Sequence, residues 1–140
     1  MKKDILLKIT GVQRFQDDEP ERTELVTDGT LERTEDALLL SYAESELTGM
    51  VGTTTTFRIE PERVLLTRSG RVQSQMIFTE GKEDQSLYDT GFGALMISVT
   101  TERIRSTMGE NGGVLEVSYR ITIENEVSGT ITYRIEAREK

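Results

Sequence analysis

The stretch Leu47-Thr48-Gly49-Met50-Val51-Gly52-Thr53-Thr54-Thr55-Thr56-Phe57-Arg58-Ile59 decides how the rest of the chain is interpreted. Two glycines precede four consecutive threonines, which lead into alternating apolar and polar side chains. Threonine and aromatic residues favour β-strands, and alternation with a period of two is typical of a strand with one buried face. The stretch therefore predicts a strand. Its apolar face would consist of Val51, Thr53, Thr55, Phe57 and Ile59.

The glycines of this stretch do not predict a phosphate-binding loop. Such a loop needs a helix whose first backbone N–H groups face the phosphate, and it usually carries a basic residue. Neither accompanies Gly49 and Gly52, nor the second glycine pair, Gly91 and Gly93. We expect these glycines to allow bends or positive φ angles where strands coil.

The remaining sequence also reads as strands separated by polar turns, and no segment has the pattern of a long amphipathic helix. Residues 37–44 are apolar enough to form a strand, although a helical turn also fits them. In addition to the threonine strand, the expected strands cover residues 4–13, 21–34, 37–44, 64–67, 72–79, a short segment around 87–88, 94–108, 115–123 and 131–137.

Two turns have specific signals. Glu60-Pro61-Glu62-Arg63 predicts a tight hairpin in which proline occupies the position that requires its fixed φ. Asn111-Gly112 suits a two-residue turn of type I′. Both turns would join antiparallel neighbours.

Two strands are expected to be irregular. Asp28-Gly29 predicts a bend or bulge within the second strand. In the strand that starts at Ala94, the apolar residues change parity between Val99 and Ile104, which predicts a bulge or bend near residues 101–103.

Sequential strands with short connections predict an all-β fold. We expect a closed, antiparallel, up-and-down β-barrel of about eight to ten strands, because closing the sheet removes its exposed edges. Residues 1–140 would form a single barrel domain. Side chains fill the interior of a barrel of this size or leave space for one small ligand.

Composition excludes several kinds of site. The chain has no cysteine and no histidine, so disulfides, thiolate nucleophiles, serine triads and histidine-ligated zinc or iron sites are absent. We therefore expect no catalytic residues, no metal site and no cofactor. The net charge of −8 argues against nucleic acid and anionic membranes as partners. The local basic pairs Arg103 with Arg105 and Arg134 with Arg138 are interpreted as solvated sheet faces.

Several segments together carry a resemblance to a known family. They are Tyr42-Ala43-Glu44 followed by Leu47-Thr48-Gly49-Met50, the threonine run, Ser74-Gln75-Met76-Ile77-Phe78, Tyr88-Asp89-Thr90 with Gly93, and Gly112-Gly113 with Tyr119. On these segments, the chain resembles the YwiB-like family, a bacterial domain of unknown function. The resemblance implies a calycin-like (lipocalin-like) β-barrel in a bacterial cytosol. It implies no activity, cofactor or catalytic residue.

The side chains expected to point inwards are the candidate ligand contacts. Hydroxyl groups in an apolar lumen orient small ligands, and methionine adapts to irregular shapes. The alternative is that these residues only pack and pair within the sheet. The candidates are Thr53, Thr55, Phe57, Ser74, Met76, Phe78, Tyr88, Tyr119 and Tyr133, with Met96 as a further pocket-lining methionine.

One pair of carboxylates, Glu44 and Glu46, lies on a single strand face. Paired carboxylates perform acid–base chemistry when burial raises the pKa of one of them. In a chain with 25 acidic residues such pairs also arise by chance, and we interpret this one as part of an exposed edge.

Three classes of function are compatible with these observations. The leading hypothesis is a barrel that binds a small, largely apolar ligand inside or at its mouth. The alternative is an interaction or structural module that pairs through an exposed strand edge or surface patch, for instance as a homodimer. An enzyme without histidine and cysteine would depend on Glu, Asp, Tyr, Lys or an added metal, and no such constellation stands out.

The N-terminal segment bears on location. Its apolar run, Ile5-Leu6-Leu7, ends at Lys8 and is not followed by a small-residue cleavage site. We interpret it as a strand rather than a signal peptide and expect a cytoplasmic protein.

Overall fold

The computed structural model describes residues 2–15, 18–44, 51–71, 73–89, 93–125 and 127–140, with the side chains of Tyr88 and Val127 left undescribed. Ten strands are present in the described residues. They are β1 (Lys2–Phe15), β2 (Glu21–Arg33), β3 (Leu38–Ala43), β4 (Thr53–Ile59), β5 (Val64–Gly70), β6 (Gln73–Phe78), β7 (Glu83–Asp89), β8 (Ala94–Ser106), β9 (Gly112–Ile123) and β10 (Val127–Glu139).

The strands form one closed antiparallel barrel. Each strand pairs with its neighbour in sequence, and β1 pairs with β10 from Ile5↔Glu139 to Phe15↔Gly129, which closes the ring. The predicted up-and-down barrel is confirmed. Residues 37–44, for which a helical turn also fitted, form strand β3.

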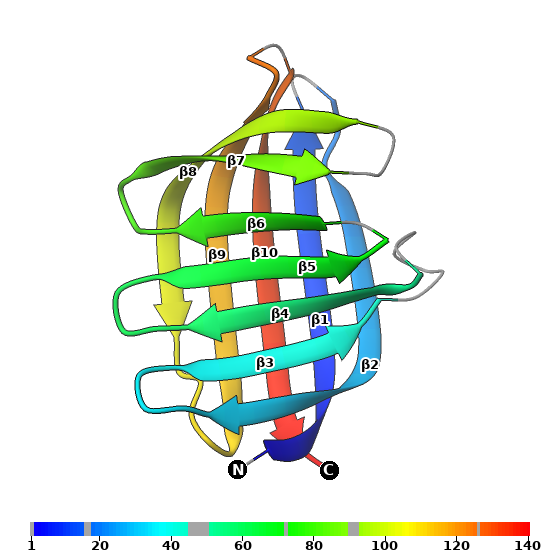
Figure 1. Ribbon diagram of the computed structural model, residues 1–140, viewed down its shortest axis with the longest axis vertical. Helices are drawn as coiled ribbons and strands as arrows, with labels where there is room; N and C mark the ends of the chain where they lie inside the picture. Colours follow the sequence, from blue (N-terminus) through cyan, green and yellow to red (C-terminus); the bar gives the residue numbers. More distant parts are fainter. Residues whose placement is uncertain (1, 16–17, 45–50, 72, 90–92, 126) are drawn as a thin grey trace.

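Long and short strands lie on different sides of the barrel. In Figure 1 the short strands β3 to β7 cross in front of the long strands β9, β10 and β1 at a steep angle. Strands β2 and β8 belong to both sides and turn the corners. The β8–β9 register shifts between Thr101 and Arg103, which confirms the predicted irregularity there.

Strand β2 turns its corner without a bulge in its ladder with β1. That ladder runs without a register shift from Gln13↔Glu21 to Lys2↔Glu32. In the described part of the chain, strand β2 pairs with β3 over Thr30–Arg33 only. Figure 1 shows the bend that brings the end of β2 under β3, so of the two alternatives predicted for this strand the bend is the one present. The upper part of β2 consequently runs away from β3.

Alternating apolar side chains fill the interior. On β4, Thr53, Thr55, Phe57 and Ile59 are all buried, as the sequence predicted. Aromatic rings form a chain through the centre. The ring centroids of Phe78 and Tyr119 lie 4.7 Å apart, and Tyr119 stacks on Tyr133 with a centroid distance of 6.3 Å. Tyr133 in turn makes a T-shaped contact with Phe57, with ring centroids 6.4 Å apart. This packing holds the short strands against the long ones.

The two predicted hairpin turns have different outcomes. The Glu60–Arg63 hairpin is present, closed by a 2.9 Å hydrogen bond from Glu60 N to Arg63 O. A hairpin also joins β8 to β9, but paired hydrogen bonds between Gly109 and Gly112 make Glu110 and Asn111 its central residues. Neither has a positive φ, so the type I′ prediction is wrong; Gly112 and Gly113 take the positive φ angles at the start of β9 instead.

The ladder between β6 and β7 is the shortest that the described residues form. Among the described residues, these strands pair only at Gln73↔Asp89 and Ser74↔Tyr88. Strand β8 extends past the core here, so Leu95, expected on the inward face, is exposed. Met96 is 38% exposed because it lies on the outward parity, opposite to Ile97, which corrects its prediction as a pocket residue. Val51 is exposed as well, ahead of β4.

Glycine allows two chain segments to approach each other beside the threonine strand. Gly52 and Gly70 both have positive φ, and a side chain on Gly70 would collide with the carbonyl oxygen of Gly52. Gly93 also has a positive φ, so the expectation holds for Gly52 and Gly93. Gly49 and Gly91 lie outside the described residues.

Candidate functional site

A row of side chains from adjacent strands crosses the short-strand side of the barrel. The register places Tyr42 beside Thr55, Thr55 beside Arg68, and Arg68 beside Ser74. Tyr42, Thr55, Arg68 and Ser74 are all buried. The apolar alternation of the strands therefore ends, near the end of the barrel, in a layer that contains hydroxyl groups and a guanidinium.

Glu44 joins this layer from the end of β3. A hydrogen bond of 2.9 Å from its backbone N–H to Thr53 O continues the β3–β4 ladder by one residue and fixes its position. The Thr55 hydroxyl donates a hydrogen bond to the Glu44 carboxylate. Glu44 Oε2 lies 3.9 Å from Arg68 Nε, and the side chains of Glu44 and Arg68 are 1% and 7% exposed. The site thus holds a buried ion pair that does not make a direct hydrogen bond.

Tyr133 is the second described partner of Arg68. Its hydroxyl oxygen accepts a long hydrogen bond of 3.4 Å from Arg68 Nη2. Two polar atoms of the pair, Glu44 Oε1 and Arg68 Nε, are buried without a hydrogen-bond partner in the described structure. Removing two charges from water costs on the order of several kcal/mol per ion, and incomplete pairing leaves much of that cost uncompensated.

The surroundings shift the pKa of the groups at this site. Burial, followed by the nearby charge of Glu44, raises the pKa of the Tyr42 phenol above its ordinary value of 10.0. Burial acts to lower the pKa of Arg68, but Tyr133, Tyr42 and Glu44 outweigh it and raise that pKa. Tyr42 is therefore a neutral hydroxyl and Arg68 a permanent cation at physiological pH.

A cleft of about 270 Å³ opens beside this layer, between the long strands and the diverging end of β3. Its walls are mostly apolar, and the buried ion pair contributes its polar end. The lining residues are Ile9, Gly11, Val12, Gln13, Thr23, Glu24, Leu25, Tyr42, Glu44, Arg68, Ile131 and Tyr133. An apolar cleft with a few convergent polar groups is the usual form of a small-molecule site.

Comparisons with known proteins agree with this fold. A family model described as "Domain of unknown function (DUF1934)" matches residues 7–135. The chain belongs to this family. It is 31% identical over 98 residues to "Uncharacterized beta-barrel protein YwiB" of Bacillus subtilis (strain 168). The match covers 67% of this chain and 68% of that protein.

A solved structure gives the same picture. The crystal structure of the ywiB protein from Bacillus subtilis superposes with a TM-score of 0.83 over 96% of this chain and 92% of that one. At 24% identity this likeness concerns the fold alone. The resemblance to the YwiB-like family is thereby confirmed. For the DUF1934 chain, function has to be argued from its own site.

The predicted ligand contacts fall into three groups in the DUF1934 barrel. Tyr133 lines the cleft. Thr53, Thr55 and Ser74 are buried in or next to the polar layer, while Phe57, Met76, Phe78 and Tyr119 pack in the interior. The side chain of Tyr88 lies outside the described structure. A ligand-binding role for these nine residues stays a prediction.

The two charged residues of the site were not recognised from the sequence. Glu44 is buried, which corrects its interpretation as part of an exposed edge; Glu46 lies outside the described residues. The signal was strand parity, because Glu44 continues the inward positions of Leu40 and Tyr42. Arg68 likewise continues the inward positions of Val64 and Leu66 on β5.

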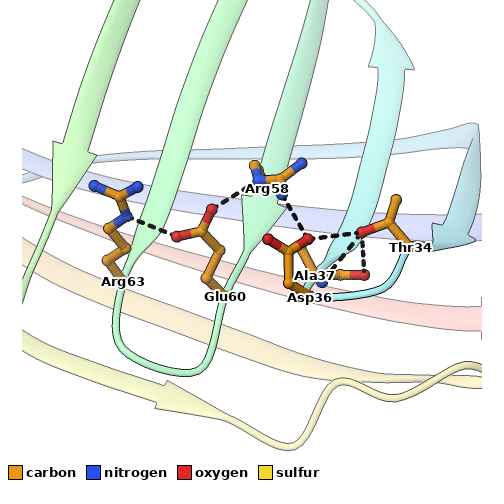
Figure 2. A network of polar contacts seen from close by, with 6 residues as sticks. All are labelled: Thr34, Asp36, Ala37, Arg58, Glu60 and Arg63. Atoms are coloured by element: carbon orange, nitrogen blue, oxygen red, sulfur yellow. Dashed lines mark hydrogen bonds and ion pairs between the residues drawn. The ribbon is translucent and has the colours of Figure 1, made fainter.

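A second arginine–carboxylate cluster lies at the opposite end of β4 and β5. Figure 2 shows Arg63, Glu60, Arg58, Asp36 and Thr34 linked in a chain. Glu60 accepts hydrogen bonds of 2.6 Å from Arg63 and 2.7 Å from Arg58, which also reaches Asp36 at 2.8 Å. The hydrogen bonds from Arg63 and Arg58 lower the pKa of Glu60. This network ties two hairpins together on the surface, and among the described residues it borders no cleft that contains a buried charge.

Other kinds of site find no support in the described residues. They contain no group of three or more acidic side chains arranged to hold a metal ion. No helix long and apolar enough to cross a membrane occurs in the described part of the chain. A wider depression of about 520 Å³ lies over the outer faces of β1, β2, β9 and β10, but its floor contains no buried charged group.

Proposed function

We propose that this protein binds a small molecule in the cleft at the end of its barrel. The ligand has a largely apolar body, which contacts Ile9, Leu25 and Ile131, and a polar head that reaches the Glu44–Arg68 pair. The observation that carries the proposal is the buried pair itself, which borders the cleft and has unpartnered atoms. Function is a common reason for a protein to retain incompletely satisfied buried charges.

The cleft fits a small ligand better than a long lipid. Its volume of about 270 Å³ is near the lower end for small-molecule pockets, which start at about 300 Å³. The aromatic chain from Phe57 to Phe78 occupies the centre of the barrel, so the ligand lies at the mouth rather than deep inside. This refines the prediction of a ligand in or at the mouth of the barrel. The cytoplasmic location stays a prediction.

Gly11 offers a way to fill the cleft while keeping the fold. It faces the cleft from β1, and the atoms nearest to a Cβ at this position would be Thr23 Oγ1, at 3.1 Å, and the Tyr133 ring, at 3.6 Å. The Thr23 side chain is exposed, so it has space to move away from the new side chain. Valine also favours a strand more than glycine does. Gly11→Val should therefore remove ligand space and keep the barrel folded.

Native mass spectrometry of freshly purified protein tests the proposal. We expect the wild type to carry a co-purifying small molecule, and Gly11→Val to lack it while melting at the same or a higher temperature. A matched control, Val26→Leu, adds a methylene group on the exposed face of β2 and should retain the ligand. Equal loading of a ligand in Gly11→Val and the wild type, or a wild type without any bound mass, would contradict the proposal.

We propose association of two copies as a second candidate function, favoured by exposed apolar residues on the β7–β8 hairpin. Leu87 and Met96 are cross-strand neighbours, and both are exposed, as is Leu95. The short β6–β7 ladder next to them leaves much of β7 without a ladder partner on that side, in the described structure. An exposed apolar strand with an unpaired edge favours pairing with an identical strand.

Light scattering after size-exclusion chromatography tests this second candidate. We expect a dimer at high protein concentration that Leu87→Glu abolishes. Val26→Glu, a control at another exposed apolar position, should leave the dimer unchanged. A monomer at every concentration, or equal effects of the two variants, would exclude pairing through the hairpin.

A further inference from the structure

The chemistry of the ion pair indicates which head group the cleft accepts. Arg68 offers N–H donors and the Glu44 carboxylate offers acceptors, with Arg68 Nε 3.9 Å from Glu44 Oε2. Nε on one side and Oε1 on the other have no partner in the described structure. A head group that complements both residues must therefore accept a hydrogen bond at one atom and donate one at an adjacent atom.

The charges of Glu44 and Arg68 further limit which head groups the cleft can accept. Glu44 and Arg68 carry opposite unit charges, so the buried pair is neutral as a whole. A carboxylate ligand would add a negative charge next to Glu44, and an ammonium ligand would add a positive charge next to Arg68. In a site shielded from water, either addition leaves one buried charge without compensation, which is costly.

We infer that the cleft selects a neutral head that carries a donor and an acceptor side by side, as in a carboxamide, a lactam or a urea. The carbonyl oxygen of the head accepts from the Arg68 guanidinium, and its N–H donates to Glu44 Oε1. The inference rests on the proposed binding function and specifies its ligand class.

The positions of both residues allow this contact. Each lines the cleft, although the two unpartnered atoms are shielded from solvent. In the described residues, the side chain of Arg68 makes one side-chain hydrogen bond, a long one to Tyr133, so few contacts oppose its movement. Binding requires the Arg68 side chain to turn so that its Nε–H faces a head group at the base of the cleft. The neutral phenol of Tyr42 offers a further hydroxyl beside Glu44.

Four probes with one shared ring separate the possible head groups. They are benzamide, benzoate, benzylamine and ethylbenzene, titrated into the full chain and followed by saturation-transfer and chemical-shift NMR. We expect benzamide to bind about ten- to a hundred-fold more tightly than the other three, the ratio expected for hydrogen bonds to a charged group. Arg134→Gln, which changes an exposed arginine paired with Glu116, is the control and should retain this order.

Changing the charge of the pair should change the preference in a defined direction. Glu44→Gln leaves Arg68 without its anion, so benzoate should become the tightest probe. Arg68→Gln leaves Glu44 without its cation, so benzylamine should gain most. If either variant does not fold, the other variant and the order of the probes on the wild type still decide.

The outcomes separate this inference from the proposed function. Benzoate or benzylamine as the tightest wild-type probe would overturn the neutral head and leave a binding cleft in place. Equal binding of all four would show that the cleft recognises only the ring, and no binding by any would also overturn the inference. The co-purified ligand and its loss in Gly11→Val test the proposed function independently, because they do not depend on the head group of a probe.

Discussion

Strands β4 and β5 carry an arginine–carboxylate cluster at each end, and the two clusters are built differently. At the β4–β5 turn, Glu60 accepts short hydrogen bonds from Arg58 and Arg63 on the surface (Figure 2). At the other end, Arg68 and Glu44 are buried, lie 3.9 Å apart and retain unpartnered atoms. The carboxylate of the first cluster accepts direct hydrogen bonds from both arginines at the surface, where water could also have served as a partner. In the second cluster, two buried polar atoms have no hydrogen-bond partner in the described structure, although they are shielded from water.

This difference separates a structural role from a functional one. An exposed ion pair contributes little to stability, because solvent screens it and it can be lost at small cost. A buried pair whose two members make no direct hydrogen bond to each other is costly to maintain, and well-packed apolar residues of similar volume would often serve stability better. The buried pair therefore has the properties expected of a group held ready for a ligand.

The largest expected effect is the removal of one member of the buried pair. Arg68→Met leaves the Glu44 charge buried without a cation and should lower the free energy of unfolding by roughly 3–5 kcal/mol. The double variant Glu44→Gln with Arg68→Met removes both charges and should recover most of that loss. Urea denaturation measures all three proteins. A double variant that is no more stable than Arg68→Met would show that the unpaired Glu44 charge is not the cause of the loss.

A smaller effect is expected at the exposed cluster, with a distinct dependence on pH. The pKa of Glu60 is lowered in the folded protein, so its contribution is present above the unfolded-state pKa, near 4.5, and is lost as the pH falls through the folded-state pKa. Glu60→Gln should be less stable than the wild type at pH 7, by less than Arg68→Met is. The free energies of unfolding of Glu60→Gln and the wild type, plotted against pH, should converge in acid.

Salt provides the control for the exposed cluster. Added salt at neutral pH should shrink the difference between Glu60→Gln and the wild type, since exposed charges are screened. The effect of Arg68→Met should change little under the same conditions. A Glu60→Gln effect that is independent of both salt and pH would mean that shape, rather than charge, holds the two hairpins together.

Strand parity explains how much of this could be predicted from the sequence. The alternation in β4 placed Thr53, Thr55 and Phe57 in the interior, and the parity change after Val99 located the β8 irregularity. Both features follow from local geometry, because successive side chains of a strand point to opposite faces. The barrel itself was predicted because a sheet of sequential antiparallel strands removes its exposed edges when it closes.

The site was harder to predict because its charged residues occupy interior positions, whereas the rest of the interior was predicted from the alternation of apolar side chains along the strands. Charged side chains are almost never fully buried unless they are paired. Glu44 was assigned to an exposed edge because pairs of acidic residues arise by chance in a chain with 25 of them, although its parity pointed inwards. Its partner Arg68 lies 24 positions further along the chain, on a strand that is not adjacent to β3. The registers of β3 with β4 and of β4 with β5 bring the two inward positions together across β4, and Tyr133 from β10 reaches Arg68 from the opposite side of the barrel.

The smallest effect concerns the phenols around the buried pair. The folded-state pKa of Tyr42 lies above 10.0, through burial first and the charge of Glu44 second, and burial raises that of Tyr119. Their stabilising contribution is therefore complete below pH 10 and is lost as the pH rises above it. In an ultraviolet titration of the four tyrosines, we expect at least two to ionise only as the barrel unfolds.

Variants at the buried pair and at the surface cluster show which groups cause the tyrosines to ionise at high pH. Tyr42→Phe should remove one late-ionising phenol. Glu44→Gln should lower the pKa of Tyr42 by removing the nearby charge, yet leave it above 10.0 because burial is the larger cause. Glu60→Gln, at the far cluster, should not change the titration. If Glu44→Gln left the tyrosine titration unchanged, the charge of Glu44 would not reach the cleft, and the polar end of the proposed ligand site would have to lie elsewhere.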